Sequence, residues 1–582
     1  MENVVFLIFR RMRAPLLALI VTYAVAVIGL VLIPGQDGEG NPWRMDFFHA
    51  FYFVSFMSTT IGFGEIPYAF TDAQRFWVTF SIFLTVVVWF YSIGTLVSLL
   101  QDKTFQGALT ELRFARRIRR LREPFYLVCG YGETGSALVR TLTDRNRHAV
   151  AIDIREERVN LLQLENLREY VPALHADASR LESLLEAGLD HRLCAGVVAL
   201  TNVNEVNLKI AIASKLMHPD IKVICRADSH EIEANMASFG TDHIYDPFDI
   251  FALYLATAIQ APCLTLLRDW LSGFHGTLLT DPLFPPAKGL WILCGFGRFG
   301  KAIYGYLKKQ ADIELVLVES APHKTGRPAG TKFVLGWGTE EITLEEAEVR
   351  RAVGLVAGTD NDANNLSIVM TARAMNSDLF VVARENQEDN AKLFERVGAD
   401  IVMHPSSIVA DRIRVLLATP LLMAFEDLAR HQEDTWACQL VSRIVAILQD
   451  RLPEVWEIEL NDEDAHAVCL MLEQTPDIPI TLDALLRDPR DRERQLPAIA
   501  LLHARDAEQR LVPEPTQPLQ LGDRLLFCGQ PCAHARMSWT LQNLHALNYV
   551  LTGGSSPEGW IWCGIMKVFR LGSKKPLQKE IA

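Results

Sequence analysis

Residues 125–153 read FYLVCGYGETGSALVRTLTDRNRHAVAID: an apolar strand, a glycine turn, a helix and a second apolar strand. Gly130, Gly132 and Gly135 form the pattern G-x-G-x-x-G, and Asp153 ends the second strand. The first glycine permits a tight turn, the second lets a pyrophosphate approach the backbone, and the third lets the helix pack on the strand. The carboxylate can accept hydrogen bonds from a ribose diol. The stretch therefore predicts an α/β fold of the dinucleotide-binding type.

A second copy of this pattern lies in residues 290–319, LWILCGFGRFGKAIYGYLKKQADIELVLVE. Its glycines and closing acid are Gly295, Gly297, Gly300 and Glu319. Further pairs that match at one constant offset are Thr201 with Thr359, Asn207 with Asn365, and Arg226 with Arg384. The sequence therefore predicts a tandem duplication of one Rossmann-like domain, covering 124–272 and 288–432, each copy closing with a crossover helix.

The two copies differ at one informative position. The first carries HADAS, with Asp177, where the second reads GWGTE, with Gly338. If the aspartate touches a bound nucleotide, the two sites differ in ligand or in affinity.

The region after the second copy reads differently. Residues 433–545 hold short alternating apolar runs and end in LQLGDRLLFCG at 519–529, which predicts a small α+β lobe with a Gly-Asp hairpin. The tail, 546–582, carries no interpretable pattern. A chain of 582 residues exceeds what a single core buries, so about three or four domains are expected.

Two long apolar runs precede the duplicated region. Residues 14–33 and 76–100 are each long enough to cross a bilayer as a helix. A signal peptide is the alternative for the first run, but this run is too long and no A-x-A-like cleavage site follows it. We therefore expect two transmembrane helices.

Basic residues near these runs predict the orientation. Arg10, Arg11 and Arg13 precede the first run, and Lys103 with six arginines from 113 to 122 follows the second. The positive-inside rule puts both termini in the cytoplasm of a cell inner (plasma) membrane protein. The basic segment, in the linker 105–123, reads as a helix under anionic headgroups, with DNA binding a remote alternative because the net charge is −13.

The cysteines predict little covalent cross-linking. The chain has 10 cysteines and no C-x-x-C pair, and all of them lie in the part expected to be cytosolic. Reduced thiols are therefore expected rather than a disulfide framework or a zinc site.

The segment between the two apolar runs is too apolar for an exposed loop. Residues 46–58, DFFHAFYFVSFMS, read as a short buried helix with an aspartate N-cap, and TTIGFGE follows at 59–65. Irregular backbone at membrane depth occurs only where protein shields it or where it lines water. Gly62 and Gly64 can reach positive φ, so successive carbonyls can face one way and replace the hydration shell of an ion. A plain glycine turn is the alternative.

TTIGFGE between two spans resembles the selectivity filter of two-transmembrane potassium channels, and residues 1–104 would form this pore module. The repeats resemble RCK (TrkA-N type) domains, and 519–529 is similar to the associated TrkA-C type lobe. Together they cover nearly the whole chain and resemble prokaryotic two-RCK potassium channels of the GsuK type. The residues implied as the potassium sites are Thr60, Ile61, Gly62, Phe63 and Gly64.

The chain departs from the family pattern at three places. Phe63 stands where tyrosine is commonest and Glu65 where aspartate is commonest, which bears on filter rigidity more than on ion preference. Ser92 takes the first position of the hinge motif G-x-G-T, leaving Gly94 as the candidate gating hinge.

The resemblance also implies assembly and regulation. One filter strand per chain cannot enclose an axis, so a homotetramer is expected, with a cytosolic ring that pulls on the inner helices through the linker. The ring would bind NAD or ADP/ATP. The implied residues of the first site are Gly130, Gly132, Glu133, Thr134, Gly135, Asp153, Ile154, Arg155, Asp177, Ala178, Thr201 and Arg226.

Calcium is a further ligand in the family, but its site is unknown here. Residues 340–348 are rich in glutamate, and this stretch reads as a solvated helix face rather than an oxygen-ligand loop. Two other functions stay open: a nonselective cation channel of the same architecture and a membrane-anchored NAD-dependent oxidoreductase. The oxidoreductase would need a substrate domain, and the chain offers a second nucleotide fold instead.

Overall fold

The structure is a computed structural model that describes residues 2–144, 146–273, 277–279, 281–448, 450–474 and 479–554. The chain divides into two compact units, which are described separately. The first comprises residues 1–123 with 172–174 and 185–193, and the second comprises the remainder.

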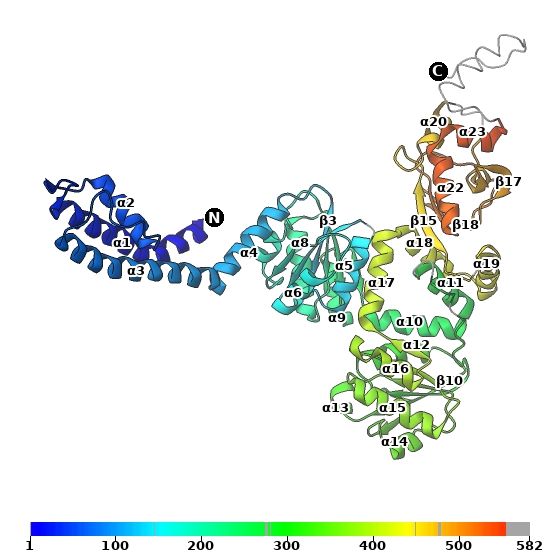
Figure 1. Cartoon of the computed structure of the whole chain (residues 1–582). Coiled ribbons are helices and arrows are strands. Elements are labelled where there is room, and N and C mark those ends of the chain that lie inside the picture. Colours follow the sequence, from blue (N-terminus) through cyan, green and yellow to red (C-terminus); the bar gives the residue numbers. More distant parts are fainter. Residues whose placement is uncertain are drawn as a thin grey trace, which may run out of the picture. The chain divides into compact units, whose positions relative to one another are not determined.

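The first unit contains the pore module (Figure 1). Helices α1 (Glu2–Leu32), α2 (Phe47–Ser58) and α3 (Asp72–Gln101) are followed by α4 (Lys103–Ile118), and the short strands β1 (Gly35–Gln36) and β2 (Pro42–Trp43) pair before α2. Residues Arg10–Leu32 of α1 and the whole of α3 are long and apolar enough to cross a membrane. The two predicted spans are therefore present as helices.

Capping residues fix where the helices of this unit begin. Asp46 accepts a hydrogen bond from the amide of His49 and caps α2. Thr71 and Gln74 form a capping box at the start of α3. The Trp77 indole donates to the carbonyl oxygen of Ala26 at 3.1 Å, which ties α3 to α1.

The first nucleotide-type sheet belongs to the second unit except for residues 173–174 at its edge. Its strands are ordered β5-β4-β3-β6-β7-β8. The bounds of its strands and helices are β3 (Phe125–Cys129), α5 (Glu133–Asp144), β4 (His148–Asp153), α6 (Glu156–Leu164), β5 (Ala173–His175), α7 (Leu181–Glu186), β6 (Cys194–Ala199), α8 (Asn204–Met217), β7 (Lys222–Arg226), α9 (His230–Ser238) and β8 (His243–Tyr245).

The second sheet repeats this order as β11-β10-β9-β12-β13-β14, with parallel pairing throughout. Its elements are β9 (Gly289–Cys294), α12 (Arg298–Leu307), β10 (Ile313–Glu319), α13 (Pro322–Thr325), β11 (Lys332–Leu335), α14 (Glu341–Glu346), β12 (Gly354–Ala357), α15 (Asp362–Met375), β13 (Phe380–Arg384), η1 (Glu388–Asn390), α16 (Ala391–Val397) and β14 (Ile401–Met403). The predicted tandem Rossmann-like fold is confirmed.

Each sheet is followed by a pair of crossover helices: α10 (Pro247–Gln260) with α11 (Pro262–Ser272), and α17 (Pro405–Ala418) with α18 (Pro420–Ala429). The helices are exchanged between copies: α10 packs on α12 of the second copy, and α17 packs on α5 of the first (Figure 1). Phe248 and Phe251 of α10 share a buried core with Phe299 of α12. The two copies are thereby held together by each other's helices.

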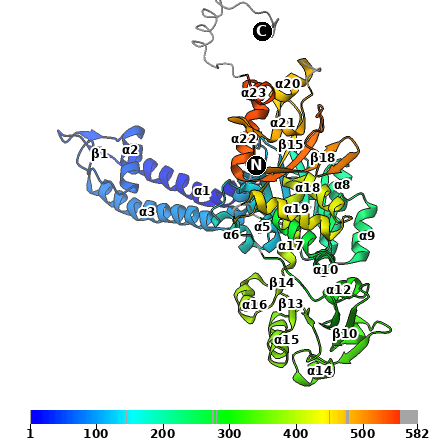
Figure 2. The ribbon, with the colours of Figure 1, turned by 90° about the vertical axis from the view of Figure 1, so that its right-hand side faces the viewer.

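The C-terminal lobe is a small α+β domain, and Figure 2 shows its helices α21, α22 and α23 near its strands. Its sheet is antiparallel, in the order β15-β20-β18-β19. The bounds are α19 (Asp434–Ile447), β15 (Glu454–Glu459), α20 (His466–Gln474), α21 (Leu482–Leu486), β16 (Arg487–Asp488), β17 (Asp491–Gln495), β18 (Ala498–Arg505), β19 (Glu508–Leu511), β20 (Arg524–Gly529), α22 (Pro531–Gln542) and α23 (Leu544–Thr552).

Two details of this lobe, and one disulfide between the lobe and α11, depart from the sequence predictions. The hairpin turn lies between β18 and β19, while Gly522 and Asp523 lead into β20. Leu547 and Val550 of α23 pack in the lobe's core, so part of the predicted tail belongs to this lobe, while 555–582 lie outside the described residues. Cys263 and Cys438 form a disulfide, so the expectation of wholly reduced thiols is wrong for this pair. Their separation of 175 residues hides the pairing from spacing rules.

Candidate functional site

The segment predicted as the filter, residues 59–65 and called the filter below, has an alternating backbone. Thr60, Gly62 and Gly64 have φ of 61°, 68° and 96°, whereas Ile61 and Phe63 between them do not have positive φ. Alternating signs of φ rotate successive peptide planes so that neighbouring carbonyls can face the same side of the chain. Positive φ at a β-branched residue is a true outlier, so Thr60 extends the pattern that the sequence predicted only for the two glycines.

The filter is anchored at its start to the short helix. The amide of Thr60 donates to the carbonyl oxygen of Met57 at 3.1 Å, and that of Ile61 donates to Phe56 at 3.0 Å. The ring of Phe63 meets that of Phe56 edge to face, with centroids 5.4 Å apart. The side chains of Ile61 and Phe63 are both exposed in the single chain.

The filter is anchored at its end by Glu65. Its carboxylate accepts hydrogen bonds from Arg75 Nε at 2.9 Å and from the amide of Phe70 at 2.9 Å. These contacts join the last filter residue to the first turn of α3. Sequence reasoning noted Glu65 but missed Arg75, because their partnership depends on how the intervening loop folds.

We expect the Arg75→Gln variant to conduct but to lose current faster during sustained opening. Both side chains of this ion pair are largely exposed and the pair contributes little, so the rate of decay should rise only about twofold. Single-channel recording measures this rate. Arg44→Gln, which removes the other basic residue between the spans, is the control, and an equal effect in both variants would contradict the anchoring role.

The predicted hinge lies in an uninterrupted helix. Gly94 is inside α3, and a Cβ added there would meet nothing within 4 Å. The role of Gly94 as a gating hinge stays a prediction.

The two glycine loops have the same close packing. A Cβ on Gly135 would lie 2.0 Å from the carbonyl oxygen of Gly130, and a Cβ on Gly300 would lie 2.0 Å from that of Gly295. Gly132 and Gly297, in contrast, have open space where a Cβ would be. This is the arrangement expected when the third glycine serves helix packing and the second faces a ligand.

The acids at the strand ends also have matching contacts. Asp153 accepts hydrogen bonds from the amides of Tyr131 and Arg155 at 2.7 and 2.8 Å. Glu319 accepts from the amides of Phe296 and Ala321 at 2.7 and 2.9 Å. Each carboxylate therefore holds its own glycine loop in place. A ribose would share these oxygens, whose remaining lone pairs can still accept hydrogen bonds.

The other predicted residues of the first copy lie around the same edge of the sheet. Asp177 accepts a hydrogen bond from the amide of Ser179 at 2.8 Å, and this bond lowers the pKa of Asp177. Ala178 beside it is buried, as is Thr134 in the first turn of α5. Ile154 is exposed. At Gly338, the matching position in the second copy, a Cβ would lie 2.9 Å from Cys294 Sγ, which leaves no room for an aspartate.

The two threonines predicted for the sites have a role in the fold. Thr201 Oγ1 donates to Asn207 Oδ1 at 2.7 Å, and Thr359 Oγ1 donates to Asn365 Oδ1 at 2.6 Å. Both asparagines are fully buried and also donate to the carbonyl oxygens of Arg226 and Arg384. The threonine and the asparagine have the same spacing in both repeats, and this repetition identified them in the sequence.

The second copy contains a cavity of about 470 Å³ over its glycine loop. Residues that the sequence predicted along its wall are Gly295, Gly297, Glu319, Thr359 and Arg384, and those it missed include Arg298, Lys324, Trp337 and Asp360. The Trp337 side chain is 55% exposed although it is a large aromatic. Arg384 Nε is buried without a hydrogen-bond partner among the described residues, and burial lowers the pKa of this guanidinium.

An ion cluster joins the two copies next to this cavity. Asp228 pairs with Arg226 of its own copy at 2.9 Å and with Arg298 of the second copy at 3.0 Å. Arg298 and Arg384 also lie over the ring of Phe248, at 5.5 and 4.8 Å from its centroid. Glu133, which occupies in the first copy the position that Arg298 has in the second, accepts a hydrogen bond from Ser406 at 3.1 Å. Arg226, predicted as a nucleotide ligand, is therefore engaged in the junction between copies.

We expect Asp228→Asn to destabilise the folded chain. Removing one partner of a buried ion pair leaves its arginine uncompensated, which costs about 3 kcal/mol. The apparent melting temperature of the full-length protein in detergent should fall by about 3 °C.

Asp312→Asn is the matched control, because the pair of Asp312 with Lys288 is exposed and contributes little. Equal losses in the two variants would contradict a structural role for Asp228.

Comparisons with known proteins define the class. The ion-channel family matches residues 16–102, and the TrkA-N domain family matches 126–247 and 291–405. The chain therefore contains one segment that matches the ion-channel family and two that match the TrkA-N domain, and the fold class predicted from the sequence is confirmed. Neither match is to an enzyme, so the comparisons give no support to the oxidoreductase alternative.

Individual relatives refine this class. An uncharacterized protein of Methanothermus fervidus is 26% identical over 226 residues, 37% of this chain and 35% of the relative. Potassium channel protein 1 of Methanocaldococcus jannaschii is 26% identical over 149 residues, 25% of this chain and 44% of the relative. The chain thus spans less than half the length of these relatives. The resemblance to potassium channels with RCK domains is confirmed.

Among solved structures, the GsuK channel bound to NAD covers 93% of this chain and 99% of its own, at 15% identity and a TM-score of 0.47. GsuK bound to ADP covers 70% and 99%, at 20% identity and a TM-score of 0.45.

Proposed function

We propose that four copies of this chain form a potassium channel whose opening is controlled by a nucleotide bound to the cytosolic domains. The observation that carries the pore assignment is the alternation of positive φ at Thr60, Gly62 and Gly64, between two apolar helices. Four such strands around an axis give stacked rings of carbonyl oxygens, which replace the water around a potassium ion. One strand alone cannot enclose an axis, so the assembly is a cyclic tetramer.

The surface of the pore helices supports a membrane setting. Large apolar side chains of α3, among them Phe76, Phe83 and Phe90, are 70% to 79% exposed in the single chain. Lipid and neighbouring subunits would cover these side chains. The distribution of basic residues supports an orientation with both termini on the cytoplasmic side of the plasma membrane.

The chemistry of the second-copy cavity supports a nucleotide ligand. Its glycine loop leaves room for a pyrophosphate, and Arg298, Lys324 and Arg384 supply positive charge. The buried Arg384 Nε has no hydrogen-bond partner within the described part of the chain, and an anion could supply one. Trp337 offers an aromatic face on which a base can stack. NAD and ADP or ATP all fit these groups.

The first copy is the other proposed nucleotide site. Its acid, Asp153, favours an unphosphorylated ribose, so NAD or an adenine nucleotide fits better than NADP. The Arg155 side chain lies 3.8 Å from Asp153 and weakens that preference. The copies differ at Asp177 and Gly338, so we expect them to differ in affinity.

Ligand binding would reach the other copy through Arg298. This arginine lines the second cavity and also pairs with Asp228 of the first copy. A phosphate near Arg298 would compete with Asp228 for the guanidinium, so the two copies would respond together. Only a ligand that binds one arrangement better than another shifts the equilibrium.

Calcium remains a candidate ligand without an assigned site. Within 340–348, Glu345 pairs with Arg350, and Glu348 pairs with Lys332 and Arg351. Glu345 lies on α14 and Glu348 just beyond the end of this helix, so the exposed pairs are shared between the helix and the turn that follows it. Among the described residues, the group of metal-type ligands that lies closely together is Cys263, Asp434 and Cys438, outside this stretch.

The deciding experiment is single-channel recording from purified protein in bilayers, with NAD, ADP and calcium applied in turn to the cytosolic face. We expect reversal potentials that follow the potassium gradient and an open probability that changes with nucleotide. Equal permeability to sodium and potassium would replace this proposal with a nonselective cation channel of the same fold.

A further inference from the structure

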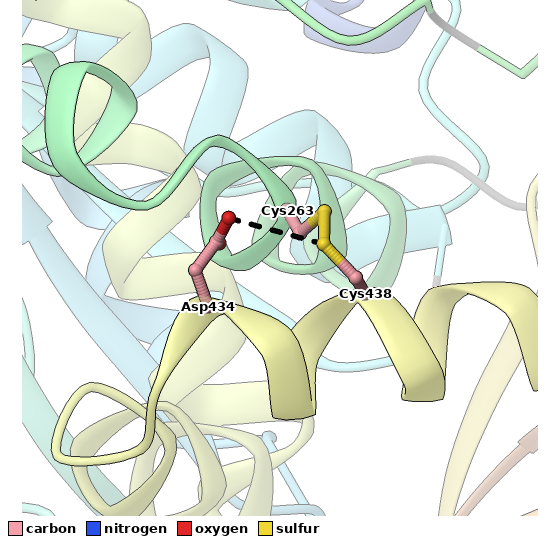
Figure 3. Close-up of side chains that lie close together, drawn as sticks. All are labelled: Cys263, Asp434 and Cys438. Atoms are coloured by element: carbon pink, nitrogen blue, oxygen red, sulfur yellow. Dashed lines mark hydrogen bonds between the residues drawn. A yellow bond between two sulfur atoms is a disulfide. The ribbon is translucent and has the colours of Figure 1, made fainter.

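A disulfide joins two helices that are far apart in the sequence (Figure 3). Cys263 is the second residue of α11 and Cys438 lies in α19, with Cα atoms 5.1 Å apart. Asp434 lies beside them: Oδ1 accepts a hydrogen bond from the amide of Leu264 at 3.1 Å, and Oδ2 lies 3.8 Å from Cys438 Sγ. The sulfurs and the carboxylate thus form one cluster at the facing ends of two helices.

The two helices share a core that connects several parts of the cytosolic region. Leu267 and Trp270 of α11 are buried with Leu440 and Ile444 of α19, together with side chains of α18 and of the C-terminal lobe's sheet. The bond therefore links the crossover helices of the first copy to the C-terminal lobe. The loop that it closes contains the whole second copy.

These cysteines differ from the buried cysteines of the chain. Burial raises the pKa of Cys225, Cys294 and Cys528 to about 12, which keeps these thiols unreactive. Cys263 and Cys438 are partly exposed, so a small reagent can reach them. Cys263 lies in the first turn of an 11-residue helix, where the helix dipole favours a thiolate.

We propose that Cys263 and Cys438 are a reversible thiol switch on the cytosolic domains, closed by exchange with a low-molecular-weight disulfide. Disulfides in a reducing cytosol are transient or redox-sensing rather than structural. The regulatory part of this inference rests on the proposed channel function, whereas its chemical part does not.

The exchange balances in two steps. The Cys263 thiolate attacks the small disulfide, a mixed disulfide forms, and one small thiolate leaves. The Cys438 thiolate then attacks the Cys263 sulfur, the protein disulfide forms, and the second small thiolate leaves. The two cysteines lose two protons and two electrons, and the small disulfide is reduced to two thiols. A dithiol reductant reverses both steps.

The closed switch would restrain motion between α11 and α19. A ligand-driven change that separates these helices, or slides one along the other, is opposed by a covalent bond across their shared core. We therefore expect oxidised channels to show a smaller nucleotide-dependent change in open probability, reduced about fivefold or more.

The chemical test uses full-length protein in detergent, reduced with dithiothreitol and then titrated with hydroxyethyl disulfide. After alkylation of free thiols and proteolysis, mass spectrometry should find the peptides of Cys263 and Cys438 joined, and dithiothreitol should separate them. Cys532→Ser, which removes an exposed free cysteine, should leave this cross-link unchanged. Absence of the cross-link at any disulfide concentration would overturn the proposal.

Asp434→Asn tests the cluster itself. A carboxylate next to Cys438 disfavours its thiolate, so removing the charge should speed closure about threefold. An unchanged or slower rate would show that Asp434 does not act on the thiol.

The regulatory test compares nucleotide responses before and after hydroxyethyl disulfide in single-channel recordings. The response of the parent channel should shrink and recover with dithiothreitol, while Cys263→Ser and Cys438→Ser should respond fully throughout. The same loss in these variants would overturn the regulatory role. A protein that forms the cross-link but passes no potassium current would instead overturn the proposed channel function.

Discussion

Gly62→Ala should abolish selective potassium conduction. Gly62 has φ of 68°, and a Cβ there would meet no neighbour within 4 Å, so the cost of alanine is conformational rather than steric crowding by other residues. A left-handed residue with a side chain costs about 1–2 kcal/mol, which amounts to about 4–8 kcal/mol over four chains. The filter should relax to another backbone conformation, and its carbonyls should leave the ion path.

Reversal potentials in potassium and sodium gradients measure this loss. Gly38→Ala is the matched control, because Gly38 lies between the same two spans, has open space for a Cβ, and does not adopt positive φ. The control should conduct normally. A Gly62→Ala channel with an unchanged permeability ratio would refute the assignment of residues 59–65 as the filter.

Asp153→Ala should weaken the nucleotide response of the first copy about tenfold or more. The variant loses the acceptor for a ribose diol and also frees the amides of Tyr131 and Arg155, which hold the glycine loop. Hydrogen bonds to a charged group contribute about 1.5–3 kcal/mol each, which is enough for this shift. Calorimetric titration with NAD and ADP measures binding independently of gating.

Glu319→Ala is the matched variant, because Glu319 makes the same two backbone contacts in the second copy. Comparing the two variants assigns each ligand to a copy. Glu182→Ala, on the exposed face of α7, should change neither affinity. Asp153→Asn keeps one acceptor oxygen for the loop while removing the charge, so it separates loop collapse from loss of the ribose contact. Unaltered affinity in Asp153→Ala and in Glu319→Ala would refute both nucleotide sites.

Local patterns explain why the fold was predictable. The apolar runs have the length of a bilayer span, and each glycine motif contains its strand, turn and helix within about 30 residues. Comparing the chain with itself then revealed the second copy. Gly135 and Gly300 are examples, since the close contact that excludes a side chain is made within the motif.

Long-range pairing explains what the sequence did not predict. Arg298 meets Asp228 across 70 residues, Ser406 meets Glu133 across 273, and Cys263 meets Cys438 across 175. Each depends on the exchange of crossover helices or on the packing of the C-terminal lobe, which no local pattern encodes. Arg226 was assigned to the nucleotide for the same reason. Its partner Asp228 is only two residues away, but Asp228 also pairs with Arg298 of the other copy, which the sequence does not reveal.

The exchanged crossover helices have a consequence for how such a chain could arise. A chain with a single copy would leave the apolar side of its glycine-loop helix uncovered, and a second, separate molecule could cover it by the same exchange. Covalent fusion of two such molecules makes this association unimolecular, so it no longer depends on protein concentration. Fusion also allows the two halves to diverge in sequence. Asp177 and Gly338, which occupy matching positions in the two copies, are one such difference.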